Sequence, residues 1–212
     1  METPAPSPDT LPEPVSGWEE NGMRHIWIAA LLVAPLRAAD VTVFLNGDAI
    51  VPNPVSYPAR SEVTRIFAGM GVGLVWQSEG VKVSSPSANS FAIHATFTTG
   101  IPKCSHPGAL AYAEPFNGIP VITVMYDRLL ITGAGRPRLA PALLAHVLAH
   151  EIGHILLGTD SHAKAGIMKA RWTNGDYDEM ERMPMLFGRS DEDSIRKRMH
   201  LVELPELSIR RK

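Results

Sequence analysis

Two histidines and a glutamate lie close together in the most apolar long stretch of the chain. The run His150-Glu151-Ile152-Gly153-His154 has the form H-E-x-x-H. On an α-helix, residues i and i+4 project from the same face one turn apart, so the imidazoles of His150 and His154 can reach one ion. Zn²⁺ accepts such nitrogen ligands, and Glu151, displaced around the helix, would address a water on the metal. The pattern therefore predicts a zinc site.

The neighbours of this motif strengthen the prediction. The flanking residues 147–149 and 155–157 are all uncharged, so Glu151 would be a carboxylate carried on an otherwise apolar helix. Burying an ionised group without a partner costs several kcal/mol, and a divalent cation is the obvious partner. A solvated helix face that carries two histidines and an acid would have polar neighbours, which are missing here.

A catalytic zinc takes three protein ligands and leaves the fourth position to water, so a third ligand must follow from elsewhere. Downstream of the helix the sequence resembles the metzincin zinc peptidases, whose pattern is H-E-x-x-H-x-x-G-x-x-H followed by a methionine turn beneath the metal. The residues that carry the resemblance are His150, Glu151, His154, Gly158, His162 and Gly166-Ile167-Met168. The short spacing from the third histidine to the methionine is most similar to the matrixin branch. The resemblance implies that Gly158 turns the chain off the helix and that Met168 forms the turn.

The sequence departs from the metzincin pattern in its spacing. Gly158 falls one residue later and His162 two residues later than in the clan, and Asp160 occupies the register position itself. Asp160 therefore competes for the third site, as in metzincin-like enzymes that use aspartate there. We favour His162, because Gly158 restarts the count and three intervening residues leave a neutral imidazole room to reach back. Asp160 would then be a hydrogen-bond acceptor near the site or a turn residue.

Three alternatives remain open. A glutamate from a later helix, Glu179 or Glu181, could be the third ligand, as in gluzincin peptidases. The motif could instead organise a non-catalytic zinc-binding module. In the third alternative the helix binds no metal.

Four other residues have ordinary interpretations. His146, one turn before the motif, is expected to be a hydrogen-bonded core histidine, and His94 a solvated one on the polar side of a strand. Cys104 is expected to be an inert thiol. Tyr177 could assist an oxyanion but is more simply a surface tyrosine.

The expected reaction is that of a zinc-dependent endopeptidase acting on a peptide or protein substrate. Glu151 would deprotonate a zinc-bound water and later deliver the proton to the leaving amine. In metzincins an edge strand above the metal binds the substrate as an additional antiparallel strand. The resemblance implies that role for residues 108–113, for which a plain loop is the alternative.

Hydrophobic periodicity indicates the elements that would position this site. Strands are expected at 41–45, 72–76, 91–98 and 121–126, with a shorter extended piece at 109–113. A helix over 59–70 would make the first two strands parallel by a crossover. The active-site helix should run from about Ala142 to Leu157 with Gly158 as its cap, and Ser190 and Asp193 indicate a capping box that opens a last helix.

These elements predict an α+β fold, with a single zincin-like or metzincin-like domain over residues 40–212. Its twisted, mostly parallel sheet would have an antiparallel edge strand, with the crossover helix, the active-site helix and a C-terminal helix around it.

Composition narrows the function classes. The 212 residues carry 20 Lys and Arg against 22 Asp and Glu, a formal charge of −2, with no basic stripe for nucleic acid. A single cysteine excludes an intrachain disulfide and a thiolate-built zinc knuckle. No apolar run reaches the roughly 18 to 20 residues of a membrane span. The pattern leaves the oligomeric state open.

Residues 1–39 are expected to form a disordered extension with a candidate signal peptide. The segment from Met23 has a basic residue, an apolar stretch over 26–36 and small residues before Asp40. This layout favours a secreted or periplasmic protein. Without a signal peptide the protein would be cytoplasmic.

Overall fold

The computed structural model describes residues 39–78, 91–100, 107–116 and 118–199. The expectations for residues 1–38 of the N-terminal extension and for Cys104 fall outside these residues and stay predictions.

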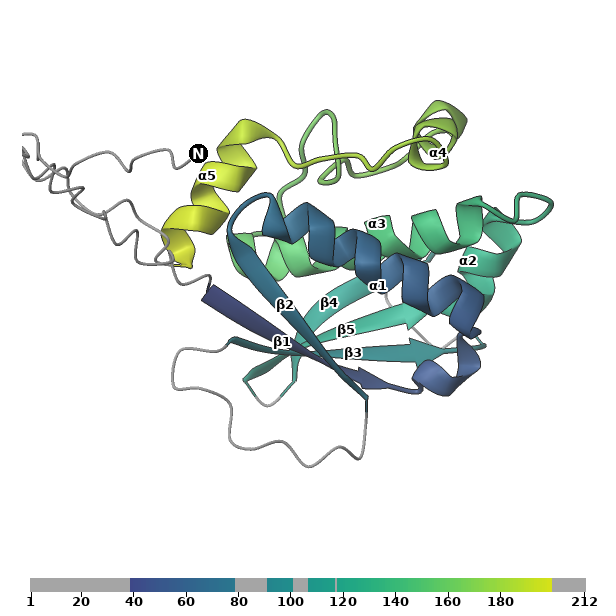
Figure 1. Cartoon of the computed structure of the whole chain (residues 1–212), viewed down its shortest axis with the longest axis horizontal. Helices are drawn as coiled ribbons and strands as arrows, with labels where there is room; N and C mark the ends of the chain where they lie inside the picture. Colours follow the sequence, from purple (N-terminus) through teal and green to yellow (C-terminus); the bar gives the residue numbers. More distant parts are fainter. Residues whose placement is uncertain (1–38, 79–90, 101–106, 117, 200–212) are drawn as a thin grey trace, which may run out of the picture. The chain divides into compact units, whose positions relative to one another are not determined.

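A five-stranded sheet supports the site (Figure 1). Its strands are β1 (Ala39–Asn46), β2 (Val72–Ser78), β3 (Phe91–Thr98), β4 (Ala111–Phe116) and β5 (Ile119–Met125), in the order β2-β1-β3-β5-β4. The first four strands in this order are parallel, and only β4 is antiparallel to its neighbour β5. The expected mostly parallel sheet with an antiparallel edge strand is therefore confirmed.

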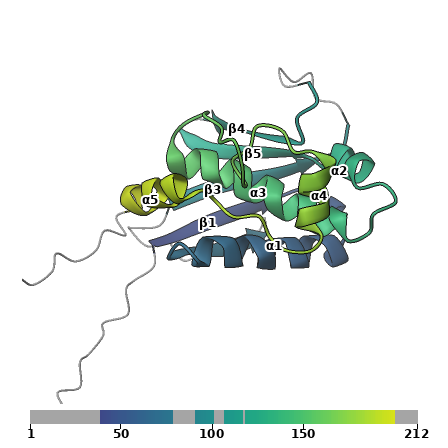
Figure 2. The same cartoon turned by 90° about the horizontal axis from the view of Figure 1, so that it is seen from above.

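The helices gather on one face of the sheet. The crossover helix α1 (Asn53–Ala68), preceded by the short 3-10 turn η1 (Asp48–Ile50), lies beside α3 (Leu139–Leu157), as Figure 2 shows from above. The shorter helices are α2 (Tyr126–Thr132), α4 (Asn174–Met180) and α5 (Arg189–Arg198). Alternate residues of β3, namely Ile93, Ala95 and Phe97, are buried in one core with both long helices. A β-strand with one buried face produces this alternation.

Helix α3 passes the length and hydropathy test for a membrane span, but two thirds of that stretch is buried inside the protein. Its apolar character reflects its place in the core, since sheet, α1 and the downstream segments cover it on several sides.

Several helix boundaries differ from the sequence-based expectation. Helix α1 starts at Asn53 and not at Ala59, because prolines suit a first helical turn and one lies in the first two positions here. The capping box expected at Ser190 is wrong: Ser190 lies inside α5, whose N-cap is Gly188 and makes no side-chain cap. The capping box in the structure is on α4, where Thr173 and Asp176 hydrogen-bond each other's backbone N–H groups.

The packing of α3 on the segment below it depends on a glycine. A Cβ atom at Gly153 would lie 2.7 Å from Met168 Sδ and 2.7 Å from the Phe187 ring. Both of these side chains are buried. Glycine at 153 therefore lets Met168 and Phe187 press directly against the helix backbone beside His154.

We expect Gly153→Ala to lower the free energy of unfolding by about 1–3 kcal/mol, because the added methyl group overpacks this contact. Gly175→Ala is the matched control: its nearest atom is 3.7 Å away, and alanine in a helix should be neutral or stabilising by up to ~1 kcal/mol. Urea unfolding of both variants measures the difference. Equal stability of the two would contradict the packing argument.

Candidate metal centre and cleft

Two hydrogen bonds fix the rings of the first two histidines. His150 Nδ1–H donates to the Ile167 carbonyl oxygen at 2.8 Å, and His154 Nδ1–H donates to the Thr159 carbonyl oxygen at 2.8 Å. A carbonyl oxygen only accepts hydrogen bonds, so each ring carries a proton on Nδ1. In a neutral ring the opposite nitrogen, Nε2, is then a lone-pair acceptor.

These two acceptors face each other. His150 Nε2 and His154 Nε2 lie 3.0 Å apart. Burial lowers the pKa of His150 to about 4 and also lowers the pKa of His154, which keeps both rings neutral near pH 7. Two lone pairs at this distance repel unless an electrophile lies between them. The two nitrogens are therefore suited to bind one cation together.

The third histidine completes the group. The ligand nitrogens of His150, His154 and His162 all lie within 4.8 Å of one another, and in the part of the chain that the structure describes no other His, Cys, Asp or Glu joins them. The ring centroid of His162 is 4.8 Å from that of His154 and 5.3 Å from that of His150.

A short loop brings His162 back to the helix. Gly158 ends α3 in the left-handed conformation, with a φ of 65°, a backbone that favours glycine. The Thr159 hydroxyl then accepts from the Ser161 N–H at 3.1 Å, which closes a tight side-chain turn. The late glycine lets α3 continue to Leu157, and this turn takes up the additional residue before His162.

The rival third ligands lie elsewhere. Asp160 is exposed on the cleft wall, and its charge only partly opposes the burial that lowers the pKa of His154. Glu181 is bound to Arg136 at 2.7 Å, and Glu179 is exposed on α4. Neither glutamate belongs to the histidine group.

A turn after His162 supports the site from below. The Ala163 N–H donates to the Met168 carbonyl oxygen at 2.7 Å, and Gly166 takes a positive φ of 75° within the turn. Met168 is 1% exposed and packs under α3 at Gly153, while the neighbouring Ile167 carbonyl holds His150. This is the position that the resemblance implied for a methionine turn.

Glu151 follows His150 directly and is the only Asp, Glu, Lys or Arg on α3. It is 7% exposed, it lines the cleft, and no residue in the described ranges hydrogen-bonds its carboxylate. Burial raises its pKa to about 7. A carboxyl group with this pKa exchanges a proton easily near neutral pH.

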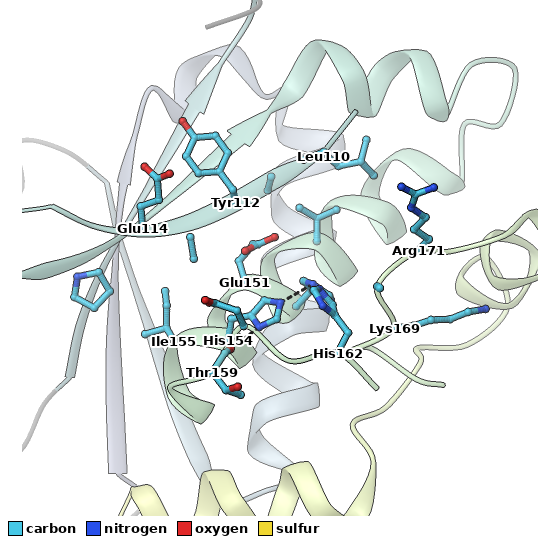
Figure 3. A pocket seen from close by; sticks show the side chains of 18 of the residues that line it. Leu110, Tyr112, Glu114, Glu151, His154, Ile155, Thr159, His162, Lys169 and Arg171 are labelled. Atoms are coloured by element: carbon cyan, nitrogen blue, oxygen red, sulfur yellow. Dashed lines mark hydrogen bonds between the residues drawn. The ribbon is translucent and has the colours of Figure 1, made fainter. Parts of the chain in front are cut away.

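The histidines open onto a cleft of about 1370 Å³ (Figure 3). One wall is β4, which crosses above Glu151, and Lys169 and Arg171 lie on another side of the cleft, beyond His162. Trp172 and Tyr177 of α4 also line the cleft. The expected edge strand is confirmed, although it starts at Ala111 and extends to Phe116.

The outer edge of β4 offers backbone groups to the cleft. The Met125 N–H donates to the Leu110 carbonyl oxygen, so the alternation of an antiparallel ladder turns the backbone groups of Tyr112 and Glu114 toward β5. Those of Ala111 and Ala113 point the opposite way. Among the described residues, only β5 pairs with β4.

His146 has a structural role that the sequence indicated only in part. It is fully buried; its Nδ1–H donates to the Ala142 carbonyl oxygen at 2.7 Å, and its Nε2 accepts from the Met185 N–H at 2.9 Å. The second bond ties the chain after α4 to the active-site helix. His94 is half-buried rather than solvated; it stacks on Phe44 in the sheet and does not belong to the histidine group.

Ion pairs anchor α4 beside the cleft, a feature missed in the sequence. Arg136 binds Asp178 and Glu181 at 2.7 Å each, and Lys169 binds Asp176 at 2.6 Å. These contacts hold Tyr177 in the cleft wall. No local pattern pairs Arg136 with residues more than 40 positions away, so only the folded chain reveals it.

Comparison with known proteins gives a fold and no sequence family. No protein-family model and no curated protein sequence matches the chain.

Solved structures do match. The archaemetzincin from Methanopyrus kandleri superposes with a TM-score of 0.50 at 14% identity, covering 80% of this chain and 99% of that one. A zinc-dependent peptidase from Methanocorpusculum labreanum gives a TM-score of 0.48 at 15% identity, over 73% of this chain and 99% of that one. The first of these confirms the expected metzincin-like fold.

The burial of His146 predicts a pH-dependent stability. Burial lowers the pKa of His146 below its ordinary 6.5, so the folded chain keeps this ring neutral where the unfolded chain takes up a proton. Stability is therefore complete above about pH 6.5 and falls as the pH drops below it, by at most ~1.4 kcal/mol per pH unit for one group.

We expect His146→Gln to reduce this slope between pH 7 and pH 5, measured by urea unfolding in chelator so that metal release does not contribute. His150 and His154 titrate in the same direction in both proteins, so the difference between the two slopes reports His146. Parallel slopes would show that its protonation is not linked to unfolding.

Proposed function

We propose that this protein is a zinc-dependent peptidase that hydrolyses peptide bonds within an extended substrate. One observation carries the proposal: three imidazoles converge beside a buried, unpaired carboxylate on the floor of a cleft whose wall is an open sheet edge. The metzincin-like fold supports it, because the archaemetzincin structure has a similar overall fold.

The donor set fits Zn²⁺. His150, His154 and His162 would hold the ion, since two of them already present unprotonated Nε2 atoms to each other at 3.0 Å. Three neutral nitrogen ligands are a common set for catalytic zinc. When bound, the ion would lower the pKa of water and polarise the scissile carbonyl group. The carbonyls of Ile167 and Thr159 would keep the two helix-borne rings oriented.

Glu151 is the proposed general base and acid. Its carboxylate takes a proton from the attacking water and later gives it to the leaving amine. A pKa raised to about 7 suits both transfers near neutral pH, and the apolar neighbours of α3 keep competing solvent away from the group.

Strand β4 is the proposed substrate platform. An extended peptide can add to an open sheet edge through main-chain hydrogen bonds. Ala111 and Ala113 supply the outward groups here, whereas Pro115, the next residue in this alternation, has no N–H to donate. Pairing by this edge is therefore short and centred above Glu151.

We expect Glu151→Gln to abolish cleavage of a broad peptide library while it retains zinc, because the amide cannot accept the proton. His162→Ala should lose both zinc and cleavage. Metal content by mass spectrometry and library cleavage, measured on the same samples, check the two results. Unchanged cleavage by Glu151→Gln would instead favour a non-catalytic zinc module.

Two matched variants separate the rival ligands. Asp160→Asn and Glu181→Gln should keep full zinc content, because neither side chain belongs to the histidine group. Zinc loss in Asp160→Asn would assign the third site to the aspartate. Zinc loss in Glu181→Gln together with zinc retention in His162→Ala would assign it to the later helix.

We expect Ala113→Pro to reduce kcat/KM about fivefold, since one main-chain hydrogen bond to substrate contributes ~1 kcal/mol. The ladder to β5 should survive, because the Ala113 N–H points away from β5, and native Pro115 is already tolerated at an equivalent position of the alternation. Thermal unfolding checks the fold, and peptide kinetics check the contact. An unchanged kcat/KM would count against substrate pairing on β4.

A further inference from the structure

The two ends of the cleft carry opposite charges that the proposed reaction does not use. Arg171 and Glu114 both line the cleft and are both exposed. In Figure 3, Arg171 lies on the Leu110 side of His162, and Glu114 lies on the opposite side, beyond His154. The catalytic groups therefore lie between a cation and an anion.

The contacts of Arg171 leave its charge available. Within the described ranges, Arg171 makes no ion pair and no side-chain hydrogen bond. Its neighbour Lys169, also in the cleft wall, is neutralised by Asp176 at 2.6 Å. The guanidinium of Arg171 is thus the uncompensated positive charge at this end of the described cleft.

The negative charge of Glu114 is likewise uncompensated at the other end of the described cleft. Its carboxylate has no ion-pair partner among the residues that the structure places. Where α3 ends, Asp160 and Arg198 both line the cleft and offset each other in sign. Arg198 also donates to the Leu157 carbonyl oxygen at 3.1 Å. Neither residue removes the difference in charge between the Arg171 end and the Glu114 end of the cleft.

The direction of β4 sets the direction of the substrate. The strand runs from the Leu110 end toward Glu114, so a peptide that pairs with it in antiparallel fashion runs from Glu114 toward Leu110. Residues before the scissile bond then lie toward Glu114. Residues after the scissile bond lie toward Arg171.

We infer that the cleft selects substrates by charge: a basic residue on the N-terminal side of the scissile bond and an acidic residue on its C-terminal side. Arg171 and Glu114 are the specificity-determining residues. This inference rests on the proposed peptidase function and adds the substrate class to it.

The test uses four quenched-fluorescent peptides that share one scissile pair and differ only in the flanking charges. They carry Lys before and Glu after the bond, the reverse, both Gln, or both Lys. The zinc-loaded wild type should cleave the Lys–Glu peptide about tenfold better in kcat/KM than the reverse peptide, because exposed ion pairs contribute up to about fivefold each. The preference should shrink at ~1 M salt, where the screening length falls to about 3 Å.

Charge-reversal variants test which residue sets the charge preference at each end of the cleft. Arg171→Glu should invert the preference after the scissile bond only, and Glu114→Lys should invert the preference before it only. Arg189→Glu makes the same charge change on an exposed residue outside the cleft, and its preferences should match those of the wild type. Equal cleavage of all four peptides by the wild type would overturn the inference and leave the peptidase proposal intact.

A binding measurement keeps the two proposals separable. Fluorescence anisotropy of the same peptides on the zinc-loaded Glu151→Gln variant reports the charge preference without turnover. If the wild type cleaves no peptide, the peptidase proposal fails, and the inference is then decided by binding alone. Equal affinity for the Lys–Glu and reverse peptides overturns it.

Discussion

The facing nitrogens of His150 and His154 are the constraint around which this molecule is organised. Each ring is turned by a carbonyl from a different segment, one after the helix end and one in the turn below the helix. Both ring orientations therefore depend on the positions of Thr159 and Ile167. The loop that delivers His162 is the same loop that provides the Thr159 carbonyl, so the ring orientation and the third nitrogen depend on one local structure.

The fold transmits this constraint into its core. Met168 and Phe187 can press on α3 because position 153 has no side chain, and Phe187 belongs to a segment that His146 holds through Met185. The Leu186 carbonyl oxygen accepts from the Ile167 N–H at 3.1 Å. A continuous set of contacts therefore connects the buried half of α3 to the turn that orients His150. Substitutions at residues 185–187 should therefore alter the orientation of the histidine rings, although none of these residues lines the cleft.

Strong periodicity made most of the fold predictable, and tertiary contacts explain what was missed. The alternation around Ile93 and the apolar helix ending at Gly158 are local signals, and both elements are present. Helix α4 is only a short polar segment in the sequence, and it depends on Arg136 and Lys169 from elsewhere in the chain. In the site, the H-E-x-x-H spacing is fixed by helix geometry. The place of His162 depends on the turn at Thr159, whose geometry no residue count supplies.

The open edge of β4 creates a risk of aggregation, which three features of the strand reduce. An unpaired strand is a template for any extended chain, including another copy of this protein, and can seed aggregation. Here the strand is six residues long, Pro115 removes a donor, and the exposed Glu114 adds a charge that two copies would bring together. Self-association along this edge is thus opposed by like charge and a missing donor, while a single guest strand of complementary charge is not.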